Sequence, residues 1–336
     1  MTPETIDLRA IDLLDPDQDD DARAWIAVHR AARRALMGED DDTWTLDEIR
    51  AFHRAGQKRR VVRGAWLEGE LVGALEVVMP LRDNQSLATL WLSVRPDVRR
   101  RGVGSALYVE GEQIAREHGR TLLHAQTGWA PGGTDEGEGF ARRRGFEIAM
   151  TDVRSSARPD ADALRDILRR APADDYTLES YVDDMPEEWL DDRAILQQRM
   201  ITDMPLGDLT LEEEAWDAER LREDNALWRD AGRRVVETVA RHVPSGSLVG
   251  FTQVSVSADD PSVGYQQDTL VLREHRGHGL GLRLKAANAL LLLDALPEVK
   301  TIRTWNANDN APMLSVNRAL GYVVDGYSRE WQKVLD

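Results

Sequence analysis

The chain of 336 residues contains no cysteine. This absence excludes disulfide bonds, zinc sites built on cysteine and any covalent intermediate on a cysteine thiol. Long apolar runs are also missing, since runs such as residues 289–293 fall far short of the roughly 20 residues that a membrane helix needs. Because the first residues are polar and acidic, we expect no signal peptide. The composition predicts a cytoplasmic protein without a membrane partner.

Positive charge is in short supply. The chain has 43 lysines and arginines against 60 aspartates and glutamates, which gives a net charge of −17. Proteins that bind nucleic acids usually present a basic face to the phosphates, so we expect no nucleic-acid partner. An acidic chain suits a cationic amine, although acidity serves solubility equally well. The length predicts two domains at roughly 150 residues per domain.

One short sequence pattern occurs twice. In each copy an apolar strand leads into Arg-x-x-Gly-x-Gly and then into an amphipathic helix. Backbone N–H groups at a helix start have no intrahelical partner and bind anions, and glycine lets the backbone approach a pyrophosphate. One Gly-rich turn is weak evidence, but two with matched flanks are not expected by chance. We therefore predict two phosphate-binding loops, formed by Arg99, Arg100, Arg101, Gly102, Val103 and Gly104, and by Arg276, Gly277, His278, Gly279, Leu280 and Gly281.

The strands before each loop distinguish two kinds of phosphate site. A dinucleotide-binding site needs a βαβ unit with the glycine loop after its first strand. Here each loop follows three consecutive strands joined by turns, which disfavours a nucleotide-dependent oxidoreductase. A helix, a strand, a second helix and a closing strand come after each loop. The predicted strands are residues 61–67, 71–79, 87–94, 121–127 and 146–153, then 233–239, 247–257, 265–272, 300–305 and 322–331.

This order and the loop pattern resemble the GNAT acetyltransferase superfamily in a tandem arrangement. The second half also carries a strand, an Asn-headed helix from Asn310 and a closing Leu-Gly-aromatic turn that look like family elements. The resemblance implies an α/β (α+β) fold of two GNAT-like domains, each a mixed, mainly antiparallel twisted sheet flanked by helices. It also implies acetyl-CoA or a related acyl-CoA as the ligand. The tandem plan is similar to that of mycothiol synthases, although no residue points to their amino-sugar substrate.

The domain limits follow from the two copies. Residues 1–158 form the first domain, residues 159–175 a helical linker and residues 176–336 the second domain. The first copy has Thr134 where an Asn should head the last helix, and its strand before the loop has no ionisable group. We therefore expect the first domain to keep its loop with a degenerate active site, and the second to be catalytic.

The resemblance also implies individual roles. Backbone N–H groups of Val94 and Val271 would contact the acyl carbonyl or the pantetheine arm of CoA, and the Asn310 side chain would contact that arm. A carboxylate on the strand before the loop often serves as base, which points to Asp268. Asp268 suits a structural ion pair or a strand end equally well, and Asn310 suits a helix cap.

The proton donor for the leaving thiolate is a departure from the family. A tyrosine is common four residues before the closing glycine, whereas this chain has Asn317 before Gly321 and Ala141 before Gly145. Ser315, Tyr322, Tyr265 or a water remain as alternatives, and Tyr322 is equally explained as a core aromatic. These residues predict an acetyl-CoA-dependent N-acetyltransferase acting directly on a primary amine of a small molecule or peptide, without a metal. The alternative is a non-catalytic acyl-CoA sensor or scaffold, and either form allows an oligomer.

Overall fold

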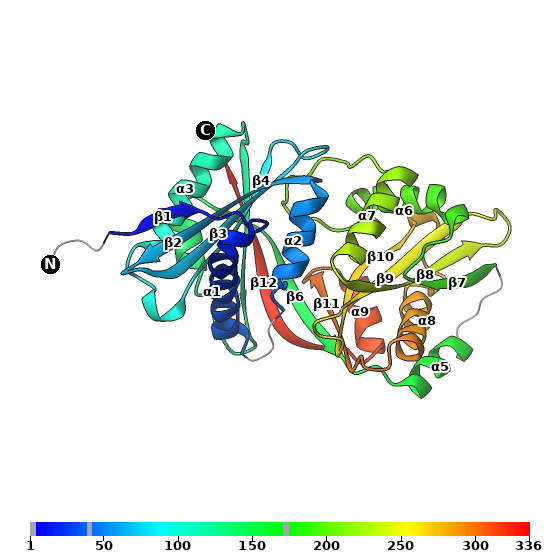
Figure 1. Cartoon of the computed structure of the whole chain (residues 1–336). Coiled ribbons are helices and arrows are strands. Elements are labelled where there is room, and N and C mark those ends of the chain that lie inside the picture. Colours follow the sequence, from blue (N-terminus) through cyan, green and yellow to red (C-terminus); the bar gives the residue numbers. More distant parts are fainter. Residues whose placement is uncertain (1–4, 39–41, 171–174) are drawn as a thin grey trace. The chain divides into compact units, whose positions relative to one another are not determined.

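The computed structural model describes residues 5–38, 42–170 and 175–336, and it divides the chain into two compact units. Unit 1 comprises residues 1–151, 208–210 and 326–336, and unit 2 comprises residues 152–207 and 211–325. Both are mixed α/β structures (Figure 1). No helix among the described residues is long and apolar enough to cross a membrane.

Unit 1 is built on one sheet in the order β1-β2-β3-β4-β5-β12. The pairs β1–β2, β2–β3 and β3–β4 are antiparallel, β5 is parallel to β4, and β12 is antiparallel to β5. Its strands are β1 (Asp7–Ala10), β2 (Lys58–Leu67), β3 (Glu70–Pro80), β4 (Leu87–Val94), β5 (Leu122–Trp129) and β12 (Val323–Val334). Its helices are α1 (Asp19–Met37), α2 (Leu46–Ala55), α3 (Val103–Glu117) and α4 (Glu138–Arg143).

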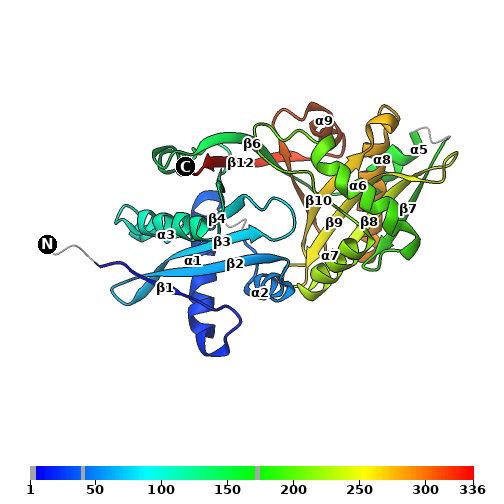
Figure 2. The same ribbon diagram turned by 90° about the horizontal axis from the view of Figure 1, so that it is seen from above.

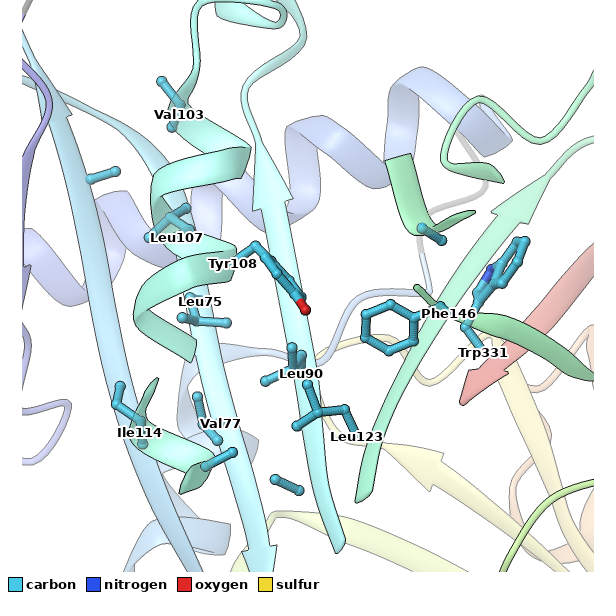
Figure 3. Close-up of a cluster of buried hydrophobic side chains, with 14 of the residues drawn as sticks. Leu75, Val77, Leu90, Val103, Leu107, Tyr108, Ile114, Leu123, Phe146 and Trp331 are labelled. Carbon is cyan, nitrogen blue, oxygen red and sulfur yellow. The ribbon is translucent and has the colours of Figure 1, made fainter. Parts of the chain in front are cut away.

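Helices cover both faces of this sheet (Figure 2). Because side chains alternate along β3, Leu75 and Val77 pack against α3, whereas Ala74 packs with Trp25 of α1 on the other face. Figure 3 shows the α3 side, where Trp331 of β12 completes the core. Strand β4 is therefore packed on both faces, and the start of α3 packs in the cluster on one of them.

Unit 2 repeats the plan in the order β7-β8-β9-β10-β11-β6. Strand β11 is parallel to β10, and β6 is antiparallel to β11. The strands are β6 (Glu147–Ala157), β7 (Tyr176–Val182), β8 (Arg233–His242), β9 (Leu248–Ser257), β10 (Val263–Val271) and β11 (Thr301–Ala307). The helices are α5 (Ala161–Arg170), α6 (Leu190–Asp203), α7 (Ala218–Asp230), α8 (Leu280–Ala295) and α9 (Ala311–Ala319).

The two closing strands are exchanged. Residues 152–157 of β6, which follow the first copy in sequence, pair with β11 of unit 2. Residues 327–334 of β12, which follow the second copy, pair with β5 of unit 1. The units therefore differ from a simple division at residues 158 and 176, because each copy contributes its last strand to the other copy's sheet.

The predicted fold class is confirmed, with four additions. The sequence patterns predicted three antiparallel strands before each loop, and the structure adds an edge strand, β1 or β7, to each set. A helix pair joins that edge strand to the next one, α1 and α2 in unit 1 and α6 and α7 in unit 2. Helix α5 covers most of the predicted linker, whose residues 171–174 lie outside the described residues.

Candidate active site

The two predicted phosphate loops have the same backbone form. Gly102 and Gly279 cap α3 and α8 with φ of +92° and +68°, in the left-handed region that glycine adopts readily. The residue after the arginine also has a positive φ in both loops, +68° at Arg100 and +87° at Gly277. The two loops thus have the same backbone conformation.

The first arginine of each loop is tied to the strand before it. Arg99 Nε lies 3.5 Å from the carbonyl oxygen of Val94, and Arg276 Nε donates to that of Val271 at 3.0 Å. The first N–H groups of α3 and α8 have no partner within their own helices. At the last glycine of each loop, Gly104 and Gly281, a Cβ would lie 3.4 Å from Val94 and 3.9 Å from Val316, so neighbouring atoms leave room there. Both loops can accept an anionic phosphate group.

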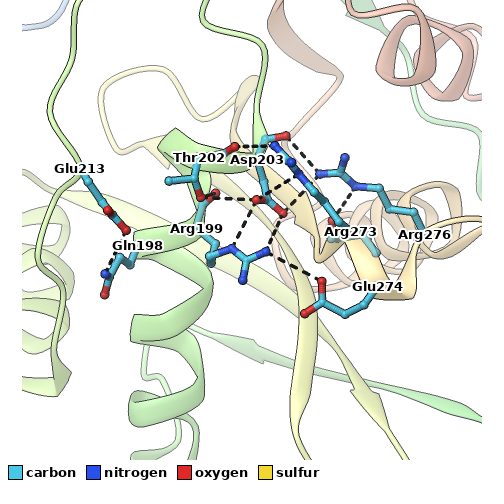
Figure 4. A network of polar contacts seen from close by, with 9 residues as sticks. Gln198, Arg199, Thr202, Asp203, Glu213, Arg273, Glu274 and Arg276 are labelled. Carbon is cyan, nitrogen blue, oxygen red and sulfur yellow. Dashed lines mark hydrogen bonds and ion pairs between the residues drawn. The ribbon is translucent and has the colours of Figure 1, made fainter.

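The second loop is held by a charged network at the end of α6 (Figure 4). Arg276 Nη2 donates to the carbonyl oxygen of Asp203 at 3.1 Å, and Arg273 Nη2 donates to that of Thr202 at 2.7 Å. The Asp203 carboxylate is buried and lies within 3.3 Å to 3.6 Å of Arg199, Arg273 and Arg276. In the first loop Arg99 pairs with Glu136 at 2.8 Å. The remaining predicted loop residues divide into buried Val103 and Leu280 and exposed Arg101 and His278.

In each unit the parallel strands separate just before the loop. Pairing of β10 with β11 ends at Tyr265 and Arg303, and pairing of β4 with β5 ends at Leu90 and Ala125, although all four strands continue within the described residues. We call this the divergence of the two strands. It leaves main-chain groups of β10 and β4 without a ladder partner on that edge.

The N–H groups predicted to contact the acyl carbonyl face the divergence. Leu272 donates its N–H to Val249 of β9, and Arg95 donates its N–H to Val72 of β3. Because successive N–H groups of a strand point to opposite edges, those of Val271 and Val94 point to β11 and β5. Their contact with a ligand stays a prediction.

Asp268 lies at an irregularity that unit 1 lacks in the described β3–β4 ladder. The register of β10 on β9 shifts between Gln266 and Thr269, whereas the β4 ladder runs from Thr89 to Val94 without a shift. A bulge redirects side chains and commonly accompanies active sites. The half-buried Asp268 carboxylate accepts a hydrogen bond from Gln197 Nε2 at 2.9 Å.

A buried polar chain extends from Asp268 into the core. Arg193 Nη1 donates to Gln197 Oε1 at 3.0 Å, and Arg193 forms an ion pair with the fully buried Glu237 at 2.8 Å. Gln253 also donates to Glu237 at 2.9 Å. These buried polar contacts fix the orientation of Gln197 and therefore of the Asp268 carboxylate. Sequence analysis missed this polar chain, because its members come from four separate elements, β10, α6, β8 and β9.

The residues predicted around α9 do not gather at one point. Asn310 caps the helix, with its side chain accepting from Met313 N–H at 3.3 Å. Ser315 is exposed on α9. Tyr322 packs in the α8 core, where burial raises the pKa of its hydroxyl. The observed cap does not test the CoA contact of Asn310, and the proton donor roles of Ser315 and Tyr322 also stay predictions.

A lysine missed by sequence analysis lies next to Tyr322. Lys285 is buried on α8, and its Nζ donates to Asn317 Oδ1 at 2.6 Å. Asn317 Nδ2 in turn donates to Asn306 Oδ1 at 2.6 Å. Burial lowers the pKa of Lys285 to about 7. Its place in an apolar helix gave no sign of this contact, while Asn317 had stood out only as a departure from the family.

Three histidines surround Tyr176 beside the second loop. Tyr176 Oη and His275 Nδ1 are 3.0 Å apart, and the His242 ring centroid is 4.8 Å from that of His275. The His278 ring lies 5.2 Å from Tyr176. Burial and the neighbouring His242 lower the pKa of His275. Among the described residues, no group of three histidine, aspartate or glutamate side chains has the arrangement of a metal site.

The fold and loops define a class of protein. Residues 24–130 match the family model described as the Acetyltransferase (GNAT) family. The chain thus contains a GNAT acetyltransferase domain, and the resemblance seen in the sequence is confirmed. The matched residues lie in the first copy, although the motifs of the second copy are the more complete.

The whole chain is similar to tandem members of this class. A tandem GNAT protein from the clavulanic acid biosynthesis pathway has a TM-score of 0.79 and 28% identity, with 98% of each chain covered. A GCN5-related N-acetyltransferase from Sphaerobacter thermophilus has a TM-score of 0.66 and 18% identity, covering 98% of this chain and 95% of that one. No curated protein matches significantly. The chain therefore contains a GNAT acetyltransferase domain, a family of acyltransferases, and its whole length has the tandem two-domain GNAT fold.

Proposed function

We propose that unit 2 transfers an acetyl group from acetyl-CoA directly to a primary amine of a small molecule or peptide. The observation that carries this proposal is the position of Asp268. It stands at the bulge of β10, between the divergence and the phosphate loop, and Gln197 holds its carboxylate. Unit 1 has Trp91 at the matching place, eight residues before the loop arginine.

The groups of unit 2 fit the steps of acyl transfer. The loop binds the pyrophosphate of CoA through N–H groups of α8 and places the thioester at the divergence. Val271 N–H donates to the carbonyl oxygen, where negative charge develops. Asp268 takes the proton that the amine loses as the new C–N bond forms and the C–S bond breaks. Asn310 and Arg276 hold the cofactor, and no metal takes part.

Charge and relatives support the choice of substrates. A net charge of −17 favours a cationic amine over an anionic acceptor. The match of residues 24–130 to the Acetyltransferase (GNAT) family supports acetyl-CoA as the donor here. Unit 1 keeps its loop and binds a second CoA or serves as a scaffold. We place the protein in the cytoplasm.

The test is thiol release from acetyl-CoA with a thiol-reactive dye and a panel of amines. The chain has no cysteine, so the protein itself gives no background. We expect release that requires one class of amine, with the acetylated amine identified by mass spectrometry. A preparation that binds acetyl-CoA yet releases no thiol across the panel would contradict the proposal and favour an acyl-CoA sensor.

A further inference from the structure

Lys285 is a buried amine without a compensating carboxylate. Its side chain lies in the α8 core, and its Nζ contacts Asn317 at 2.6 Å and the Tyr322 ring at 5.0 Å from the centroid. No carboxylate among the described residues forms an ion pair with it. Burying an unpaired ammonium costs free energy, so burial favours the neutral amine and brings the charged and neutral forms of Lys285 close in free energy. The lowered pKa, about 7, agrees with this position.

The contacts of Lys285 lead to the divergence of β10 and β11. Asn317 joins it to Asn306, which lies on β11 beyond Arg303, where the pairing with β10 ends. Helix α8 itself begins at the phosphate loop, and Lys285 stands six residues beyond its cap Gly279. At a rise of 1.5 Å per residue this is about 9 Å along the helix. An acyl-CoA held by the loop and extended along the divergence therefore passes this network.

The network and the proposed base are held by different helices. Asp268 contacts α6 through Gln197, whereas Lys285 belongs to α8 and contacts α9 through Asn317. Amine transfer needs both a proton acceptor and a proton donor, because the amine loses a proton and the thiolate gains one. A carboxylate and a near-neutral amine supply this pair.

We propose that Lys285 is the proton donor for the CoA thiolate in unit 2. The amine nitrogen bonds to the acyl carbon and gives its proton to Asp268. The C–S bond breaks, and sulfur takes a proton from the Lys285 ammonium to leave as the thiol. Lys285 is then neutral and Asp268 protonated, and one proton passing between them through solvent restores both. The inference rests on the proposed function.

The decisive measurement is the pKa of the thiol of bound CoA, followed by the ultraviolet absorbance of the thiolate in the full-length protein. A nearby ammonium stabilises the thiolate, so Lys285→Met should raise the thiol pKa by about one unit while CoA affinity stays within about twofold. Amine-dependent thiol release should fall by about 10- to 100-fold. Tyr108→Phe is the matched control, because Tyr108 holds the corresponding position on α3 of unit 1 and should change neither quantity.

Asn317→Asp tests the same role in the opposite direction. A carboxylate at 2.6 Å would raise the pKa of Lys285, so the alkaline limb of the rate profile should move to higher pH. Normal CoA binding with an unchanged thiol pKa in Lys285→Met, or an unmoved profile in Asn317→Asp, would overturn this inference alone. Failure of the unaltered protein to bind CoA would overturn the proposed function and the inference with it.

Discussion

Units 1 and 2 each have a phosphate loop of the same form, but they differ in the strand that precedes it. Eight residues before the loop arginine, unit 1 has Trp91 and unit 2 has Asp268. Trp91 stacks on His29 at 3.7 Å, and His29 Nδ1 lies 2.9 Å from Ser93 Oγ. Burial lowers the pKa of His29 far below its usual range, so this ring is neutral. The matching place in unit 2 holds a hydrogen-bonded carboxylate.

The comparison shows that binding and chemistry depend on different parts of the fold. The loop works through main-chain N–H groups and positive φ angles, which both copies preserve with different side chains at Arg100 and Gly277. Proton transfer depends on single side chains, which the copies do not share. The duplicated fold therefore keeps two loops of the same form, whereas the proposed base, Asp268, has no counterpart in unit 1.

Asp268→Asn should have the largest effect on this comparison. The amide keeps the shape and the contact with Gln197 but cannot accept the amine proton, so amine-dependent thiol release should fall by at least about 100-fold. Affinity for CoA, measured by calorimetry, should stay within about twofold. Trp91→Phe in unit 1 is the control and should retain the activity. Loss of activity in the control with full activity in Asp268→Asn would move the active site to unit 1.

Much of this comparison could be predicted from sequence. The turn chemistry of the loops and the period of the flanking elements are local, so β4 was predicted with its observed bounds. The exchange of β6 and β12 was missed, because both strands carry similar patterns and only long-range pairing decides their sheet.

The polar contacts of the site were also beyond sequence analysis. Asp268 and Gln197 are 71 residues apart, and Lys285 and Asn317 are 32 residues apart. Neither pair has a local pattern, since each partner lies on a different element. The sequence pointed to Asp268 through its place before the loop, whereas nothing in the apolar period of α8 distinguished Lys285 as functional.

Each exchanged strand carries one ionisable residue whose replacement is predicted to change stability, in opposite directions. In β6, burial and the nearby Asp309 raise the pKa of Asp152 to about 6. The neutral acid favours folding below its unfolded pKa of about 4, and this contribution disappears as the pH rises through 6. Asp152→Asn should therefore raise the free energy of unfolding at pH 7 by about 2 kcal/mol.

Chemical denaturation at two pH values checks the Asp152 prediction, and the same measurement tests Arg329 of β12. At pH 4 the variant and the unaltered protein should agree within about 0.5 kcal/mol, because the native acid is neutral there. In β12, Arg329 pairs with Asp135 at 3.1 Å and Glu138 at 2.7 Å, so Arg329→Gln should destabilise by about 1 kcal/mol. Equal stabilisation of Asp152→Asn at both pH values would show that its charge is not the cause.

Valine at the two cap glycines should separate the ligand sites. Gly102→Val and Gly279→Val force a β-branched residue into the left-handed region, at a cost of about 1–2 kcal/mol at each loop. We expect two CoA sites per unaltered chain, and in each variant one site of unaltered affinity and one about tenfold weaker. Calorimetry gives the number of sites and the affinity of each. If Gly102→Val leaves both sites intact or the unaltered chain binds one CoA, unit 1 is a scaffold without a ligand.

The smallest effect concerns pH, since the charges of the first loop are permanent and part of those beside the second loop are titratable. Arg99, Arg100 and Arg101 stay charged. Burial and the neighbouring His242 lower the pKa of His275, and Glu274 partly offsets this shift. His275 therefore gains its charge only below its usual pKa of about 6.5, and CoA affinity at the second loop should rise about two- to fivefold from pH 7 to pH 5.

The two valine variants isolate this pH effect. Gly102→Val leaves the second loop to bind CoA, and Gly279→Val leaves the first, so the first loop reports the titration of CoA itself. Replacing His275 and His278 together by glutamine in the Gly102→Val background should flatten the extra rise. An equal rise at both loops would place the titration on the ligand and make the histidines packing partners of Tyr176, because a charge on the protein would act at its own loop alone.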